Sequence, residues 1–226
     1  MNKYIKGIFI FLKITFLLFI ILIIVGIYKL THDPFDFDDL EYSSKKELVE
    51  NYELKQKEIT ELYNYAKSIT ENGKIYVDIE FKNDKNIEIF RVEMDSLDIE
   101  KIKDSNSVQP IYYTNSYYDL KVKSKTVDTL LNKLNWTRET LKMLKTKLDA
   151  ANCTSVNSGE PMTIGFKRNG LGMYYYKIFE NALTDSLINR YNDGCAYIFY
   201  KDNVVLEYTG GAIGMQCFET YYNKEK

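Results

Sequence analysis

Few side chains in this chain are suited to nucleophilic or metal chemistry. His32 is the only histidine, and it lies in an acidic stretch that follows an apolar N-terminal run. Ser-His-Asp and Cys-His systems need an imidazole beside the nucleophile. Histidine-rich zinc sites and H-E-x-x-H proteases need more than one histidine. The cysteines have no C-x-x-C spacing, which excludes a thioredoxin-like motif and a zinc knuckle. We therefore predict no catalytic, metal or cofactor residues.

Carboxylates are the remaining catalytic option, because two acids held on opposite sides of a bond can hydrolyse a glycoside. The C-terminal half contains Glu160, Asp185, Asp193, Glu207 and Glu219. Their spacing does not show that any two converge, and the chain has a single tryptophan on which a sugar ring could stack. A carboxylate-based cell-wall glycan hydrolase is therefore the alternative function, and we favour a protein that is not an enzyme.

Two other segments resemble ligand sites only in composition. Gly210 to Gly214 is rich in glycine but lacks the Lys-Ser/Thr of a phosphate loop, so we expect a flexible turn. Lys142, Lys145 and Lys147 share a predicted helix, opposite its apolar side. We interpret them as a solvated face rather than an anion site.

Cys153, Cys195 and Cys217 are the only cysteines. In an oxidising compartment we expect one disulfide and one remaining thiol. The spacing does not indicate which two cysteines pair. If the domain faces the cytoplasm instead, we expect three buried, reduced cysteines.

The longest apolar run extends from Gly7 to Tyr28 and is interrupted only by Lys13. At about 1.5 Å per residue, it matches a hydrocarbon core of roughly 30 Å. The run is longer than the apolar region of a cleavable signal peptide, and no A-x-A pattern follows it. We therefore predict a retained transmembrane helix, in which the long stem of Lys13 reaches the nearer interface.

Basic residues around this run indicate its orientation. Lys3, Lys6 and Lys13 precede its centre, and only Lys29 follows it closely. Positive charge resists translocation, so we expect a cytoplasmic N-terminus and a C-terminal domain outside the cytoplasm. Two lysines at positions 45 and 46 weaken this bias.

Composition divides the chain into a transmembrane anchor (1–30), an acidic linker (31–41) and a soluble domain (42–226). The linker lacks the spaced glycine and distal glutamate of a calcium loop. Four of the 30 basic residues and no acidic residue precede Leu30, which leaves 26 basic against 32 acidic residues, a net charge of −6. A module of this sign repels phosphate backbones, so we do not expect nucleic acid as a partner.

The N-terminal part of the soluble domain predicts one long helix followed by strands. Ser44 and Glu47 have the spacing of a capping box, and apolar residues recur behind them at helical spacing over 44–70. Alternating residues then predict strands over 75–81, 87–94 and within 110–122. The apolar phase slips at Ile89-Phe90, which suggests a bulge.

The C-terminal part predicts two more helices and four strands. Residues 126–152 have the pattern of two helices, the second capped by Thr137. Strands are expected over 162–167, 171–179, 195–200 and 204–208, with a brief helix over 184–191. Two to four helices on one face of an antiparallel sheet make an α+β fold.

Three runs in this half, LNWTRETLKMLKTKLDAANC, MYYYKIF and YNDGCAYIFYKDNVVLEYTGGAIGMQCF, have a familiar pattern. They cover roughly Leu134 to Phe218 and resemble small uncharacterised membrane-anchored envelope proteins of AT-rich Gram-negative bacteria. The resemblance implies no activity and no site residues. It implies a bacterial inner-membrane setting, in which the domain expected outside the cytoplasm is periplasmic.

These observations predict a single-pass protein that contacts the lipid bilayer through its N-terminal helix. We expect its extracytoplasmic α+β domain to bind a protein or an envelope component. The 20 tyrosines suit recognition surfaces, because the ring is buried while the hydroxyl stays hydrated or bonded. Codon bias is the alternative explanation, since Lys, Ile and Asn are enriched as well. A small acidic module also suits an immunity-type inhibitor that is complementary to a basic toxin.

Overall fold

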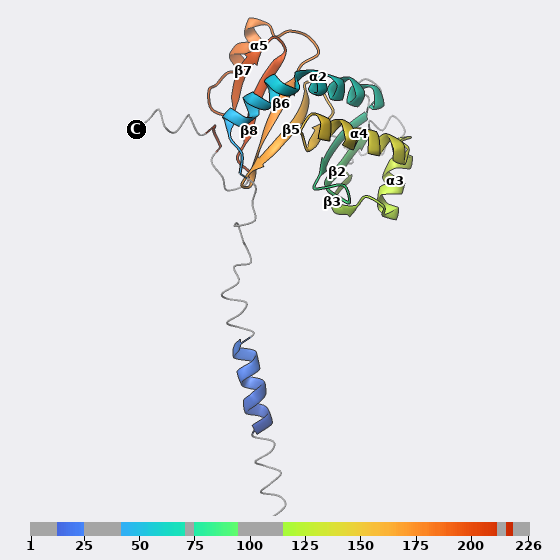
Figure 1. Ribbon diagram of the computed structural model, residues 1–226, viewed down its shortest axis with the longest axis vertical. Helices are drawn as coiled ribbons and strands as arrows, with labels where there is room; N and C mark the ends of the chain where they lie inside the picture. The colour runs from blue at the N-terminus through green and yellow to red at the C-terminus, as the bar shows by residue number, and fades with distance from the viewer. Residues whose placement is uncertain (1–12, 25–41, 71–74, 95–114, 212–215, 219–226) are drawn as a thin grey trace, which may run out of the picture. The chain divides into compact units, whose positions relative to one another are not determined.

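The computed structural model describes residues 13–24, 42–70, 75–94, 115–211 and 216–218. The chain divides into two compact units, Met1–Leu40 and Glu41–Lys226. In the first unit, residues 13–24 form a helix (Figure 1). All of its side chains are exposed.

Within the described ranges, no helix is both long enough and apolar enough to cross a membrane. The structure therefore does not support the transmembrane helix predicted over Gly7 to Tyr28. Residues 7–12 and 25–28 of that run lie outside the described ranges.

The second unit contains an eight-stranded sheet in which every strand pair is antiparallel. The strand order is β3-β2-β1-β4-β5-β6-β8-β7. The strands are β1 (Ile75–Phe81), β2 (Asn86–Met94), β3 (Asn115–Lys121), β4 (Ser155–Asn157), β5 (Met162–Asn169), β6 (Gly172–Ile178), β7 (Tyr197–Lys201) and β8 (Val204–Thr209). This confirms the predicted α+β class and the antiparallel sheet.

The helices of this unit are α2 (Lys45–Ile69), α3 (Lys125–Lys133), α4 (Arg138–Ala150) and α5 (Asp185–Arg190). Their beginnings follow from local capping. The hydroxyl of Ser44 accepts a hydrogen bond from the amide of Glu47, whose carboxylate accepts one from the Ser44 amide. This reciprocal arrangement satisfies amides that have no partner inside the helix. Thr137 caps α4 as predicted, and Thr184 caps α5.

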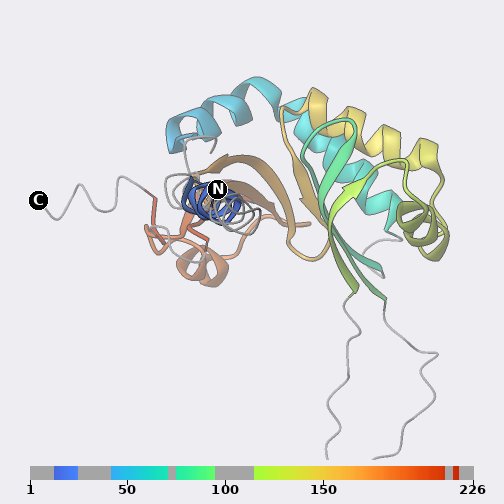
Figure 2. The same cartoon turned by 90° about the horizontal axis from the view of Figure 1, so that it is seen from below.

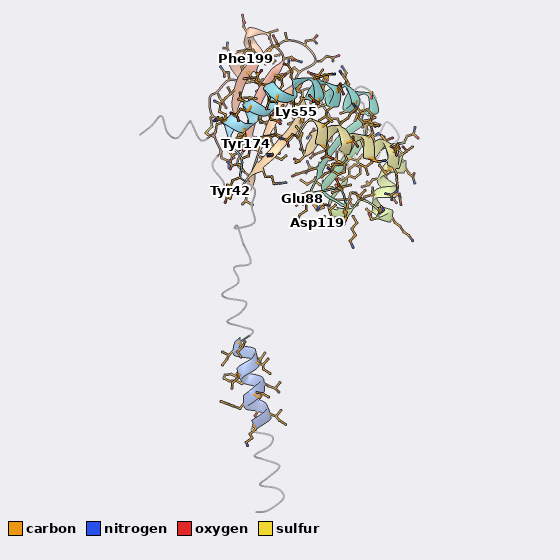
Figure 3. All side chains as sticks on the ribbon, in the orientation of Figure 1. Tyr42, Lys55, Glu88, Asp119, Tyr174 and Phe199 are labelled. Carbon is orange, nitrogen blue, oxygen red and sulfur yellow. A yellow bond between two sulfur atoms is a disulfide. The ribbon has the colours of Figure 1, made fainter. Side chains whose placement is uncertain are left out.

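Helices α2 and α4 lie together over one face of the sheet (Figure 2). Because strand side chains alternate, β6 presents Tyr174, Tyr176 and Ile178 to this core. The hydroxyl of Tyr176 donates to the Leu48 carbonyl at 2.7 Å and accepts from the Asn51 amide at 3.1 Å. These bonds fix α2 on the sheet, and side chains fill the space between them (Figure 3).

Helix α5 packs on the opposite face, at the β7–β8 end of the sheet. Its Leu187 and Ile188 contact a small apolar cluster formed by Phe179, Leu183 and Val205. The prediction that the helices share one face is therefore wrong for α5. The physical reason is that β8 is apolar on both faces where it begins, since Val204 and Leu206 enter the main core while Val205 points away from it.

Two local details differ from the sequence-based expectation. Residue Ile89 pairs with Glu80 and Ile87 with Phe81, so the extra residue of the β2 bulge is Glu88 rather than Ile89-Phe90. Strand β4 was not predicted. It has only three residues, too few for an alternating pattern, and it bridges β1 and β5.

Candidate functional site

The sheet surface opposite α2 and α4 carries polar and charged side chains, which we call the open face. Strand register places Tyr76, Asp78, Glu80, Arg91, Ser116, Tyr118, Asn157, Arg168, Tyr175, Lys177 and Glu207 on it. Among the described residues, α5 is the one helix that packs on this side of the sheet. It lies at the edge formed by β7 and β8.

A bidentate ion pair lies near the middle of the open face. Arg168 donates from Nε and Nη2 to the two carboxylate oxygens of Glu80, at 2.9 and 2.7 Å. Such a forked pair fixes both side chains in direction as well as distance. Glu80 is only 7% exposed, and this burial raises its pKa although Arg168 pulls the pKa down.

A second network joins β1, β2 and β3. Arg91 donates to Asp78 at 3.2 Å and to the hydroxyl of Ser116 at 3.0 Å. On the adjacent strand pair, the amide of Asn157 donates to the Tyr76 hydroxyl at 2.6 Å. These bonds hold polar side chains from four strands in one fixed layer.

The third pair lies between β6 and β8, where the Lys177 ammonium is 2.9 Å from the Glu207 carboxylate. Lys177 also lies 5.8 Å above the centre of the Tyr197 ring. Burial, reinforced by Glu207, raises the pKa of Tyr197 to about 12. Burial likewise raises the pKa of Tyr175 to about 12.

The open face is thus an ordered, electrically balanced surface. Three acids are each matched by a basic residue, and the Tyr76 hydroxyl is bonded to Asn157 of the neighbouring strand. Ordered Tyr and Arg side chains are the groups that dominate binding at protein interfaces. In the described part of the chain, no group of His, Cys, Asp and Glu could hold a metal ion.

Three of the five acids considered for glycan hydrolysis have other partners in the structure. Glu160 accepts a hydrogen bond from the Glu180 amide, and Asp193 accepts from the amides of Cys195 and Tyr197. Glu207 is the partner of Lys177 described above. Asp185 begins α5, while Glu219 and His32 lie outside the described residues. Glu160, Asp193 and Glu207 therefore each hold local structure.

Cys195 and Cys217 form a disulfide, with their sulfur atoms 1.93 Å apart. Cys153 remains a free, buried thiol, and its burial raises its pKa. The structure thereby resolves the pairing that spacing left open. The sequence contains no signal for it, because the bond depends on residue 217 returning to the loop before β7.

The disulfide holds the chain beside a buried aromatic residue, Phe218. The Phe218 ring lies 5.7 Å from the Tyr174 ring and 5.9 Å from the Tyr208 ring, and its amide donates to the Cys195 carbonyl. The ammonium of Lys45, at the start of α2, lies 5.7 Å from the same ring. The first turn of α2 and this late segment therefore share one anchoring cluster.

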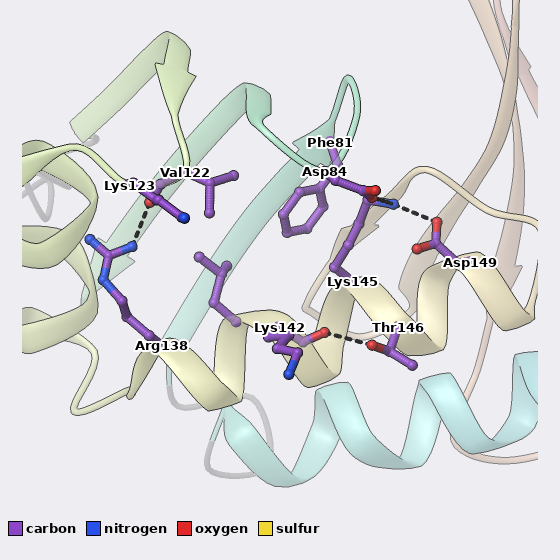
Figure 4. Close-up of a pocket in the computed structure, with 10 residues that line it drawn as sticks. Phe81, Asp84, Val122, Lys123, Arg138, Lys142, Lys145, Thr146 and Asp149 are labelled. Carbon is purple, nitrogen blue, oxygen red and sulfur yellow. Dashed lines mark hydrogen bonds and ion pairs between the residues drawn. The ribbon is translucent and has the colours of Figure 1, made fainter.

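The three lysines of α4 do not behave alike. Lys147 pairs with Glu61 of α2 at 3.5 Å, whereas Lys142 and Lys145 line a cleft (Figure 4). Lys145 is only 19% exposed. The interpretation of this group as a merely solvated face is therefore wrong for Lys145. Lys145 also pairs with Asp84 in the turn between β1 and β2, and Lys147 pairs with Glu61 of α2; the helix pattern alone does not reveal these two partners.

Because comparison with known proteins gives no match, the proposed function rests on the fold and its geometry. No protein-family model, curated protein or solved structure matches this chain. The class that the structure defines is an α+β module with one helix-covered sheet face and one polar, tyrosine-containing face.

Proposed function

We propose that this protein is a membrane-tethered, extracytoplasmic module that binds a protein partner through the open face. The observation that carries the proposal is the ordered set of tyrosines and paired charges on a sheet surface that α2 and α4 leave uncovered. A surface whose side chains are already fixed loses little conformational entropy on binding. Paired charges also set register and exclude partners of the wrong charge pattern.

The proposed location rests on two features. The apolar run from Gly7 to Tyr28, with lysines concentrated before its centre, favours an inner-membrane anchor with the domain in the periplasm. The Cys195–Cys217 disulfide is the type of bond that persists in an oxidising compartment. Fusion of a reporter that is active only in the periplasm to the C-terminus tests this. An inactive reporter on a stable fusion would contradict it.

We further propose that the partner is basic and that the module acts as an immunity-type inhibitor. The chain after the apolar run has a net charge of −6, which attracts a basic protein over several ångströms before contact. The balanced pairs of the open face then select for shape and hydrogen-bonding pattern rather than for charge alone.

Site-specific photocrosslinking in living cells tests the binding surface. Tyr118 is 59% exposed on the open face, and a benzoylphenylalanine at this position should give one discrete protein adduct. The matched control carries benzoylphenylalanine in place of Gln56, which is exposed on α2. The absence of an adduct at position 118, or the same adduct from both positions, would contradict the proposal.

The identity of the captured protein tests the immunity role. The purified partner should be toxic when produced alone, and growth should recover when this protein is produced with it. Tyr118→Glu should weaken protection, while Gln56→Glu should not. A captured protein that is not toxic would remove the immunity role and leave the binding surface in place.

A further inference from the structure

A cleft of about 670 Å³ lies apart from the open face, on the side of the molecule that carries α4 (Figure 4). It is bounded by α4, by the turn between β1 and β2, and by the chain that leaves β3. Its volume falls in the range of small-molecule sites, about 300–1,000 Å³. The open face and the cleft use different residues.

The base of the cleft is apolar. Phe81 ends β1 and is 5% exposed, and Leu141 in the first turn of α4 is 2% exposed. Val122, just after β3, is half-buried between them and packs against the main core. An apolar ring or short chain placed here would cover this surface and release the water on it.

One end of the cleft is basic. Arg138 is held in place by a 2.7 Å bond to the Val122 carbonyl and by Asp128 at 2.5 Å. Lys123 lies beside it (Figure 4) and is exposed. Lys142 follows one turn along α4 and is also largely exposed, 3.8 Å from Glu139.

The other end is already neutralised within the protein. The Lys145 ammonium lies 3.2 Å from Asp84 and 2.5 Å from Asp149. The acids that line the cleft are therefore engaged by one lysine. The basic side chains that line the rest of the cleft are Lys123, Arg138 and Lys142. Arg138 and Lys142 each also pair with an acid outside the lining, Asp128 and Glu139.

We propose that this cleft binds an organic anion with an apolar body. Its carboxylate or phosphate group contacts Lys123, Arg138 and Lys142, and its body lies over Phe81, Val122 and Leu141. A bound anion of this kind satisfies both the basic end and the apolar base, whereas a cation meets like charge and an inorganic anion leaves the base uncovered. Carboxylate and phosphate share this chemistry, because both accept charge-assisted hydrogen bonds from Arg and Lys.

Calorimetry on the full chain in lipid nanodiscs tests the proposal, with 1-naphthyl phosphate and 2-naphthoate as the anionic probes. Empty nanodiscs provide the blank. Naphthylmethylammonium, which has the same naphthyl ring but a positive charge, provides the cationic probe. Saturable binding of either anion and none of the cation is expected. The tighter of the two anions identifies the preferred head group. Equal binding of the cation, or no saturable binding of either anion, would overturn the proposal.

Three variants locate the binding. Lys123→Glu/Lys142→Glu should lower the affinity for the anion by about tenfold or more, because it reverses the charge of two residues at the basic end. Lys125→Glu/Lys133→Glu makes the same charge change on exposed positions of α3 and should leave affinity within about twofold. Thr146→Trp should block the cleft without altering charge. Equal weakening by the α3 control, or unchanged affinity in the other two variants, would overturn the assignment.

Discussion

At the scale of residues, the pair formed by Glu80 and Arg168 shows how the open face is held. The carboxylate is almost buried, while the guanidinium is 36% exposed. Replacing Arg168, the more exposed partner, therefore leaves the buried Glu80 carboxylate without its two hydrogen bonds. Breaking a buried pair costs more than the pair contributes as a whole, because desolvation of the remaining charge is no longer offset.

We expect Arg168→Ala to lower the free energy of unfolding by about 2 kcal/mol, less than for a fully buried pair because Arg168 contacts solvent. Chemical denaturation of the variant measures this loss. Arg190→Ala, on the exposed side of α5, is the control and should have little effect. Adding Glu80→Gln to Arg168→Ala should recover part of the loss. A double variant no more stable than the single one would show that the unpaired charge is not the cause.

The pKa of Glu80 predicts a pH dependence of stability. Burial raises its pKa in the folded protein above the ordinary value of 4.5. The folded state therefore holds this proton more tightly than the unfolded state, and the stabilisation from Glu80 falls as pH rises from 4.5 through the folded pKa. The unfolding free energy of the wild type minus that of Glu80→Gln should decrease over this interval. A difference that increases with pH would contradict the expected sign.

At the scale of elements, the predictions that held depend on residues close in sequence. Ser44 and Glu47 lie within one turn, as do Thr137 and Thr140, so each helix start can be predicted from local spacing. The open face could not be predicted in this way. Glu80 and Arg168 are 88 residues apart, and they meet only because β4, which has three residues, pairs with both β1 and β5 and sets these strands one strand apart.

The cleft shows the same difference between features that local sequence predicts and features that depend on the fold. The sequence predicts the helix that carries Lys142 and Lys145, but Phe81 and Val122 reach the cleft from the ends of two other elements. The choice between a solvated lysine and a lysine in a site therefore depends on tertiary packing. The cysteines behave likewise, since three candidates could be named and only the fold selects the pair.

Loss of the Cys195–Cys217 disulfide should release the segment that carries Phe218. In the chain-entropy model, a bond with a sequence separation of 22 contributes about 3 kcal/mol. For a unit of this size the melting temperature of Cys195→Ser/Cys217→Ser should fall by about 6–12 °C. A reducing agent should lower the wild-type value similarly and leave this variant unchanged. Cys153→Ala should remain sensitive to the reducing agent, and an insensitive wild type would contradict a structural disulfide.

At the scale of the whole molecule, the proposal depends on the N-terminal unit keeping the second unit at a membrane. The exposed side chains of residues 13–24 are almost all apolar, and two of them, Phe16 and Leu22, are more than 60% exposed. An apolar surface of this kind is unfavourable in water and favourable in lipid. The binding module would then meet its partner at a surface, where a tether raises the local concentration.

Membrane fractionation tests this arrangement. The full chain should stay in membranes washed with alkaline carbonate, and a chain lacking residues 1–40 should appear in the wash. Leu18→Asp/Leu22→Asp should reduce retention, because each carboxylate costs about 2.5–3.5 kcal/mol at the centre of a spanning helix. Deletion of residues 31–40 alone should not, since it removes no part of the apolar run. Recovery of the intact full chain from the wash without detergent would contradict the tether, while the anion binding of the cleft and the crosslink from Tyr118 would remain separately measurable.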